Sequence, residues 1–320
     1  MNYKPIIVVA GEPNSVFLEI FFKAQKKYNF KKPIVLIVSK RILIEQMKKL
    51  NFNFKINEID LKKNLNFKKK KNNIINIIDI NYKFKKCFDK ISEKSNPYIE
   101  KSFVTALKLL KKKQFSGLIN GPISKKYFLR EKFLGITEYL GNKEKSEVAM
   151  LIYNKKLSVS PLTTHLPLKE VNKKISKKKI INHANLISRF YKSEFKKVPK
   201  IAITGLNPHC ESNYKSSEEE KIIKPAIKYL IKRNFKVEGP FAADTIFLKE
   251  NYSKFDVIIG MYHDQVLTPI KTIFGFNAIN ITLGLPFIRI SPDHGPNSKM
   301  LGKNLSNPQS LIEALKFLDK

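Results

Sequence analysis

Three of the five histidines in this 320-residue chain occupy the same kind of position. His165, His209 and His263 each come shortly after an apolar run that predicts a β-strand. Imidazoles from three strand ends, gathered in one cleft, would bind a divalent metal ion and leave a position open for a substrate oxygen. No two of them form a local motif such as HExxH, so a structural, hydrogen-bonded histidine is the alternative for each one taken singly.

The other candidates near these histidines are weaker. Asp264 directly follows His263 and is a candidate either to orient a neighbouring group or to act as a base. His294 lies in the turn-like segment SPDHGP and is expected to line the same cleft, whereas His183 lies in a helical pattern and is expected to be a surface or packing residue.

The elements that must position these residues follow from the apolar pattern. Short β-branched runs alternate with amphipathic stretches of helical period, which is typical of an α/β fold with a largely parallel sheet. The predicted strands cover residues 5–10, 33–39, 74–80, 116–120, 148–153, 157–163, 200–206, 256–262, 278–284 and 287–291. The predicted helices cover residues 15–28, 41–50, 97–114, 178–195, 217–235 and 307–318.

Polar residues concentrate where five of the predicted strands end. GEPNS, NGPISK, TTHLPL, LNPHCES and MYHDQ each follow a strand. Ligands of open α/β sheets bind at the carboxyl ends of strands, so these clusters predict one shared cleft. Apart from its polar residues, segment 260–295 is interpreted as buried strand and turn. The Lys/Asn-rich segment 51–73 is interpreted as an insertion or exposed excursion.

Composition limits the class of protein. A hydrophobic content of 42% with 23 Phe is typical of a globular protein with a core. No apolar run reaches the length of about 18 residues that a membrane span requires, and the first residues are interpreted as a strand, not a signal peptide. Cys87 and Cys210 are far apart and form no CxxC, which favours a reducing, cytoplasmic location.

The formal net charge of +34 raises the question of a nucleic-acid partner. Only five of the 61 basic residues are Arg, and lysine cannot copy the fork that arginine offers to bases and phosphates. The excess of Lys is accompanied by abundant Asn, Ile and Phe. This joint bias is typical of proteins encoded by A/T-rich genomes. We therefore expect solvated basic faces, no membrane partner and no nucleic-acid partner, although the positive field favours small acidic substrates.

In eight segments the chain resembles the 4-hydroxythreonine-4-phosphate dehydrogenase family of pyridoxal phosphate biosynthesis. They run in family order along almost the full length, and several are long and unusual. The segments are GEPN (11–14), NGPISK (120–125), GITEYLG (135–141), TTHLPLKEV (163–171), GLNPH (205–209), EGPFAADTIF (238–247), MYHDQ (261–265) and TLGLPFIRISPDHG (282–295).

This resemblance implies a three-layer α/β/α fold like that of isocitrate dehydrogenase, with two lobes around a central cleft. The first lobe would hold residues 1–130 plus about 290–320, and the second residues 131–289. The family likeness also implies a homodimer with its active site at the interface. NAD or NADP would bind without a GxGxxG loop, which this sequence lacks, at residues that we do not assign.

The resemblance also implies roles for single residues. His165, His209 and His263 would bind one divalent ion (Zn, Co, Mn, Ni or Mg), with one ligand crossing the dimer interface. The substrate contacts would be Ile136, Thr137, Lys271, Asn280 and Arg289. Arg289 suits a bidentate grip on phosphate or carboxylate, and a structural salt bridge is its alternative. Asp244 in AADTIF would lie near the cleft, and an N-cap is its alternative.

The implied reaction is NAD-dependent oxidation of 4-phosphooxy-L-threonine to a 3-keto acid, which decarboxylates to 3-amino-2-oxopropyl phosphate. The chain departs from the family at Ile136, where the family carries a histidine that contacts substrate, and in two glycine-poor loops. These departures leave open a dehydrogenase for D-threonate or D-erythronate 4-phosphate. A metal-dependent hydrolase and a basic nucleic-acid-binding protein with a decayed active site are further alternatives.

Overall fold

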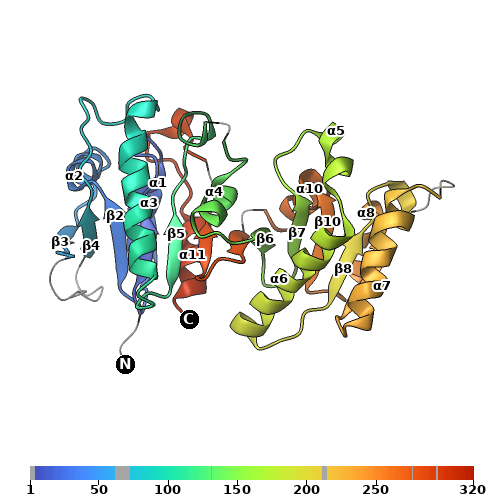
Figure 1. Cartoon of the computed structure of the whole chain (residues 1–320). Helices are drawn as coiled ribbons and strands as arrows, with labels where there is room; N and C mark the ends of the chain where they lie inside the picture. Colours follow the sequence, from blue (N-terminus) through green and yellow to red (C-terminus); the bar gives the residue numbers. More distant parts are fainter. Residues whose placement is uncertain (1–3, 62–72, 131, 211–214, 276, 293–294) are drawn as a thin grey trace. The chain divides into compact units, whose positions relative to one another are not determined.

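The computed structural model describes residues 4–61, 73–130, 132–210, 215–275, 277–292 and 295–320. Contacts divide the chain into two compact units. Unit 1 comprises residues 1–136 and 286–320, and unit 2 comprises residues 137–285. The sequence-based division drew its boundaries at 130 and about 290, so Arg289 falls in unit 1 and not with the lobe expected to carry it. Both units are built from strands and helices, which confirms the α/β class (Figure 1).

The sheet of unit 1 is entirely parallel, with strand order β3-β4-β2-β1-β5-β12. Its central strands carry uninterrupted apolar runs because both of their faces are buried; residues 6–9 are 0% exposed. The strands are β1 (Ile6–Val9), β2 (Ile34–Val38), β3 (Lys55–Glu58), β4 (Ile74–Asp79), β5 (Gly117–Asn120) and β12 (Arg289–Ser291).

Helices cover both faces of this sheet. The chain steps in one direction from β1 through β2 and returns from β4 to β5, so right-handed crossovers place α3 on the face opposite α1 and α2. Figure 1 shows α3 in front of the strands, and α1 packs on α2 and α11. The helices and short helical turns are α1 (Phe17–Lys27), α2 (Lys40–Lys49), η1 (Glu93–Ser95), α3 (Asn96–Leu110), η2 (Lys125–Leu129), η6 (Ser298–Met300) and α11 (Gln309–Leu318).

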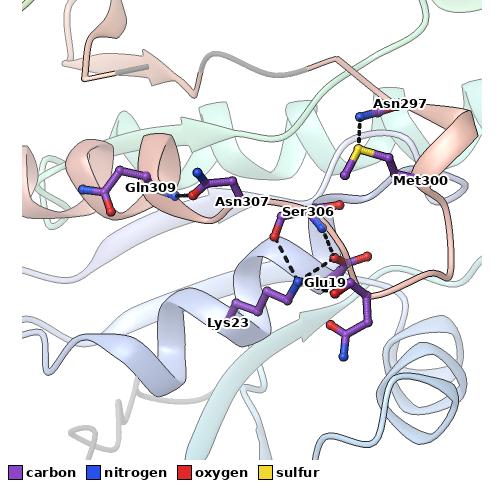
Figure 2. Close-up of polar contacts among 8 residues, drawn as sticks. Glu19, Lys23, Asn297, Met300, Ser306, Asn307 and Gln309 are labelled. Atoms are coloured by element: carbon purple, nitrogen blue, oxygen red, sulfur yellow. Dashed lines mark hydrogen bonds and ion pairs between the residues drawn. The ribbon is translucent and has the colours of Figure 1, made fainter. Parts of the chain in front are cut away.

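A buried ion pair fastens the segment before α11 to α1 (Figure 2). The Glu19 side chain is 2% exposed, and its Oε1 accepts from the Lys23 Nζ at 2.9 Å. The same oxygen accepts from the backbone N–H of Ser306 at 2.5 Å. Lys23 also donates to the carbonyls of Asn304, at 2.8 Å, and Ser306, at 3.0 Å. The last helix of unit 1 and the segment before it are therefore held to its first helix by charge as well as by packing.

The sheet of unit 2 has the order β11-β6-β7-β10-β8-β9. β6 runs antiparallel to both neighbours, and the other pairs are parallel. The expectation of a mostly parallel sheet is therefore confirmed. The strands are β6 (Ala149–Tyr153), β7 (Ser158–Thr163), β8 (Ile201–Thr204), β9 (Val237–Phe241), β10 (Val257–Tyr262) and β11 (Ile279–Leu283).

Two layers of helices enclose this second sheet. α6 packs on α7 and on β6, β7 and β11, whereas α10 packs on β7 and β10. The α10 layer closes a core that includes Val159, Ile258, Val266 and Ile270. The helices and short turns are α4 (Ile136–Lys143), α5 (Leu168–Val171), η3 (Asn172–Lys174), α6 (Lys177–Phe195), η4 (Pro208–Cys210), η5 (Glu219–Ile223), α7 (Lys224–Lys232), α8 (Ala243–Ile246), α9 (Lys249–Tyr252) and α10 (His263–Phe274).

All ten predicted strands are present, but the helix α4 and the short helices α5, α8 and α9 were not predicted, and three further segments differ from expectation. Part of segment 51–73 is not an excursion, because residues 55–58 form the edge strand β3, whose polar side chains carry no apolar signal. The strand β9 was missed because VEGPF contains Gly and Pro, which are tolerated at a sheet edge. The interpretation of residues 263–274 as strand and turn was wrong. They form α10, whose pattern is disguised by Pro269 within the helix.

Two further observations concern the cysteines and possible membrane spans. Cys87 and Cys210 are both buried and form no disulfide. Among the helices in the described ranges, not one combines the length and the apolar character needed to cross a membrane.

Candidate active site

The carboxyl ends of three neighbouring strands of unit 2 carry the three predicted ligand histidines. β10 pairs in parallel with β7 on one side and β8 on the other, so all three strands end at one edge of the sheet. His165 follows β7, His209 follows β8, and His263 directly follows β10 as the first residue of α10. The fold therefore delivers all three side chains to one end of unit 2.

Two of the three rings are neighbours. The ring centroids of His165 and His263 lie 5.5 Å apart, with the ring planes at 40°. The Nδ1 of His263 lies 2.6 Å from Oδ1 of Asp264. In the tautomer with its proton on Nδ1, the ring donates to this carboxylate and has the lone pair of Nε2 available to a metal ion. Asp264 thus orients the neighbouring imidazole.

His209 lies in the exposed loop after β8. Its backbone φ is +60° and that of Cys210 is +56°, so two consecutive non-glycine residues adopt the left-handed conformation. Within the part of the chain that the structure describes, no three histidine, cysteine or carboxylate side chains come together as a metal site. Among the described residues His165 and His263 therefore lie together, and the ring of His209 does not join them.

A buried carboxylate holds the loop that carries His209. Glu219, at the start of η5, is 0% exposed. Its Oε1 accepts from the N–H of Leu206 at 2.8 Å and of Asn207 at 2.9 Å, and its Oε2 accepts from the side-chain amide of Asn207 at 2.8 Å. Burial by itself would raise the pKa of Glu219, but the hydrogen bonds from Asn207 and Leu206 outweigh it, and the pKa is lowered. The carboxylate is therefore charged where it binds the loop.

A second buried side chain joins the same loop to the start of α10. Gln265 is 9% exposed. Its Oε1 accepts from the N–H of Met261 at 2.7 Å and from the Thr204 hydroxyl at 2.9 Å, and its Nε2 donates to the carbonyl of Gly205 at 2.8 Å. The ends of β8 and β10 are thereby held together.

Our sequence reasoning missed both Gln265 and Glu219 as site residues. For Gln265 a signal existed, because it lies two residues after His263 inside the MYHDQ segment. For Glu219 no signal exists, because it is the middle of three consecutive glutamates, Glu218 to Glu220.

The helix α4 brings the predicted substrate residue Thr137 into unit 2. Thr137 is 4% exposed, and its Oγ1 lies 3.3 Å from the hydroxyl of Thr282 on β11. The next residue, Glu138, accepts from the hydroxyl of Thr164 at 3.1 Å, directly before His165. Ile136, the first residue of α4, is partly buried. This helix is therefore connected to the strand end that carries the first of the predicted ligand histidines.

The predicted anion-binding residues lie in both units. Lys271 is exposed on α10, and Asn280 is half-buried on β11. Among the described residues, the side-chain oxygen of Asn280 is buried without a hydrogen-bond partner. In unit 1, Arg289 on β12 is 0% exposed, and its Nε donates to Oδ1 of Asn120 at 2.7 Å. The partner of this nitrogen is thus a neutral amide at the end of β5.

The last two candidates are Asp244 and His294. Asp244 is the second residue of α8 and is exposed, while the N-cap of that helix is Ala242, so the N-cap interpretation of Asp244 is wrong. His294 lies outside the described residues.

The GEPN and NGPISK loops pack on each other at the strand ends of unit 1. Gly11 has φ +75°, and a Cβ there would lie 2.4 Å from the carbonyl oxygen of Pro122. The next residue, Glu12, is 2% exposed. Burial raises the pKa of Glu12, although hydrogen bonds from the N–H of Asn14 and the hydroxyl of Ser95 oppose this shift. The first loop is thus closely packed and stabilised internally.

Comparison with known proteins gives matches along most of the chain. Residues 29–318 match the family model described as "Pyridoxal phosphate biosynthetic protein PdxA". The 4-hydroxythreonine-4-phosphate dehydrogenase of Sulfurihydrogenibium sp. (strain YO3AOP1) is 37% identical over 317 residues, which are 98% of this chain and 96% of the relative. That of Aquifex aeolicus (strain VF5) is 32% identical and covers 99% of this chain and 98% of its own length.

Solved structures are similar over the same extent. The 4-hydroxythreonine-4-phosphate dehydrogenase of Klebsiella pneumoniae gives a TM-score of 0.86 at 25% identity, with 98% of each chain covered. A putative 4-hydroxythreonine-4-phosphate dehydrogenase from Salmonella typhimurium gives 0.86 at 26% identity, with 99% of each chain covered.

Proposed function

Because the chain belongs to the pyridoxal phosphate biosynthetic protein PdxA family, we propose that it is a dehydrogenase of pyridoxal phosphate biosynthesis. Its substrate would be 4-hydroxythreonine 4-phosphate, the compound after which its relatives are named. A hydride would pass from C3 to NAD or NADP, and the hydroxyl on C3 would lose its proton. The resulting 3-keto acid would lose carbon dioxide to give 3-amino-2-oxopropyl phosphate.

The observation that carries this proposal is the pair formed by His165 and His263, with ring centroids 5.5 Å apart and one ring oriented by Asp264. Neutral imidazoles held in this way fit Zn, Co, Mn or Ni better than Mg. His209 would be the third ligand. Since one subunit does not assemble all three rings, we propose that a homodimer does so, with one ligand crossing its interface.

The metal ion and the side chains of the site would have different roles in the reaction. When bound, a divalent cation supplies Lewis-acid polarisation that makes the C3 hydroxyl more acidic. Asp244 and Asp264 are the candidate acceptors for the hydroxyl proton, and His294 is a third candidate whose position is not described. The chain's own groups hold the substrate so that its C3 faces the nicotinamide.

Charge and burial support anion-binding roles for Arg289 in unit 1 and for Thr137 and Asn280 in unit 2, and the charge of Lys271 supports the same role in unit 2. The guanidinium of Arg289 is fully buried and its Nε is held by Asn120, so its terminal nitrogens keep a fixed orientation suited to phosphate or carboxylate. In the described part of the chain the buried side-chain oxygen of Asn280 lacks a partner. Buried polar atoms normally have a hydrogen-bond partner, and a donor group of the ligand would be that partner here.

A second candidate function is supported by Ile136. This apolar side chain stands at the start of α4, beside Thr137, at the position where the family resemblance implies a histidine. A sec-butyl group cannot donate a hydrogen bond to an anionic substrate, and losing such a contact costs about 1–3 kcal/mol. The alternative is therefore oxidation of D-threonate or D-erythronate 4-phosphate, which share the phosphate and the hydroxyl with the first substrate.

One set of assays tests both candidates. The purified protein is mixed with NAD and with each phosphorylated acid in turn, and NADH is followed by its absorbance. We expect NADH with 4-hydroxythreonine 4-phosphate, its loss on adding EDTA, and its return when Zn, Co or Mn is restored. Faster turnover of a threonate or erythronate phosphate would select the second candidate. Absence of NADH with all of them, while metal is bound, would exclude both.

The ligand assignment needs its own measurement. His165→Ala and His263→Ala should each reduce the metal content of the purified protein. The matched control is His183→Gln, which changes a buried histidine on α6 whose contact is with Ser160. Metal contents that are equal in all three variants would contradict the assignment.

A further inference from the structure

The loop that carries His209 has a backbone conformation that its own residues do not favour. His209 and Cys210 are both left-handed, with φ values of +60° and +56°, and neither is glycine. For residues with a Cβ this conformation is unfavourable, so two in succession need support from their surroundings. Something outside the loop must therefore keep it in this shape.

Glu219 supplies three of the hydrogen bonds that hold the loop. Its carboxylate accepts two backbone N–H groups, from Leu206 and Asn207, and the side-chain amide of Asn207, all within 2.9 Å. These residues end two positions before His209. Since Glu219 is 0% exposed, water does not compete for these bonds.

The neighbouring glutamates do not share this role. Glu220 is exposed and forms an ion pair with Lys224 one turn along the helix. Glu218 is half-buried and accepts from the side-chain amide of Asn207, at 3.0 Å. Of the three consecutive glutamates, the middle one alone binds the backbone of the loop among the contacts of the described residues.

We propose that Glu219 is a positioning residue for the metal site, which holds the loop 205–210 so that His209 is presented to the metal without reorganisation. The inference rests on the proposed function, in which His209 is a ligand. Glu219 touches neither metal nor substrate. It restricts the conformation of the loop before the metal binds. Less conformational entropy is then lost on binding.

The experiment is a Co²⁺ titration of the full-length, metal-free protein, read by calorimetry and by the visible absorption of the bound ion. In Glu219→Gln the amide cannot accept from both the backbone and Asn207, so we expect the Co²⁺ affinity to fall about tenfold. Glu220→Gln is the matched control, with the same chemical change one residue away, and should remain within about twofold of the parent protein.

A double-mutant cycle with His209→Ala separates positioning from a general loss of stability. If Glu219 acts through His209, Glu219→Gln should lower the Co²⁺ affinity in the parent protein and have no further effect once His209 is gone. An equal loss in both backgrounds would overturn the proposal, as would an unchanged affinity in Glu219→Gln.

Two further outcomes are distinguishable. If His209→Ala leaves the Co²⁺ affinity unchanged, the ligand assignment is wrong and this inference fails with it. If His209→Ala weakens Co²⁺ but Glu219→Gln does not, the inference fails alone. Should Glu219→Gln not fold, Asn207→Ala removes only the side-chain bonds to the glutamates. We expect it to lose about threefold in affinity, and an unchanged affinity there would also overturn the proposal.

Discussion

The side-chain nitrogen of Gln265 donates to the carbonyl oxygen of Gly205 at 2.8 Å and thereby joins the first turn of α10 to the end of β8. The oxygen of the same amide accepts from Met261 on β10 and from Thr204 on β8. A single neutral side chain thus bridges two strand ends, each of which is followed by a predicted metal ligand.

Gln265→Leu should destabilise unit 2 and weaken metal binding together. The substitution leaves the N–H of Met261 and the carbonyl of Gly205 without a partner in a buried place, which costs about 2–3 kcal/mol. Urea unfolding of the metal-free protein measures the loss. The control is Gln309→Leu on α11, where the amide bonds only to Glu313 one turn away. Equal effects of the two substitutions would contradict the bridging role.

Buried His183 should make the protein sensitive to acid. Its Nε2 lies 2.6 Å from the hydroxyl of Ser160, and burial, with a smaller effect of the nearby Lys179 charge, lowers the pKa of His183 to about 3. The unfolded chain keeps the ordinary pKa of 6.5. Between these values the unfolded state binds the proton and the folded state does not, so stability falls as the pH drops below 6.5.

The corresponding measurement compares the parent protein with His183→Gln. From about pH 7 to about pH 5 the parent should lose about 2 kcal/mol more unfolding free energy than the variant, which keeps a donor for Ser160 but has no titrating ring. Parallel pH profiles would show that His183 is not the group responsible.

Lys23→Met should destabilise unit 1 strongly. Removing this ammonium leaves Glu19, 2% exposed, as a buried charge without its ion-pair partner. The expected cost is about 3 kcal/mol. The matched control is Lys173→Met, which breaks an ion pair with Glu170 whose partners are 65% and 35% exposed, and its effect should stay below about 1 kcal/mol. A Lys23→Met protein as stable as this control would mean that the buried pair contributes little.

Asn120→Leu should raise the KM for the phosphorylated substrate and leave the KM for NAD unchanged. It removes the acceptor that holds Nε of Arg289, so the guanidinium loses its fixed orientation. The loss of a hydrogen bond to a charged group corresponds to an increase in KM of about tenfold. Asn57→Leu, which breaks an amide pair with Asn76 at the sheet edge of unit 1, is the control. Similar changes in both KM values would argue for a general disturbance.

The strands were readable in the sequence because the central ones are buried on both faces. Runs such as residues 6–9 and 34–38 need no knowledge of their partners to be recognised. Edge strands lack this property. β3 exposes polar side chains and β9 contains Gly239 and Pro240, so neither carries a pattern that distinguishes it from a loop.

The helix α10 shows a different limit. Val266, Leu267 and Ile270 are buried at helical spacing, but Pro269 and the preceding strand made the segment resemble a strand followed by a turn. The packing of this apolar face against β7 and β10 overrides the local preference.

The sequence by itself determined which chemistry this chain can carry: imidazoles after apolar strands, one arginine in a buried run, and motifs shared with a family of dehydrogenases. Tertiary structure alone decided which of these groups meet and what holds them. It paired His165 with His263, and it selected Glu219 from three adjacent glutamates to bind the loop of His209. The reason is physical, because residue type and spacing specify donors and charges, whereas burial and hydrogen-bond partners depend on segments that are remote in sequence.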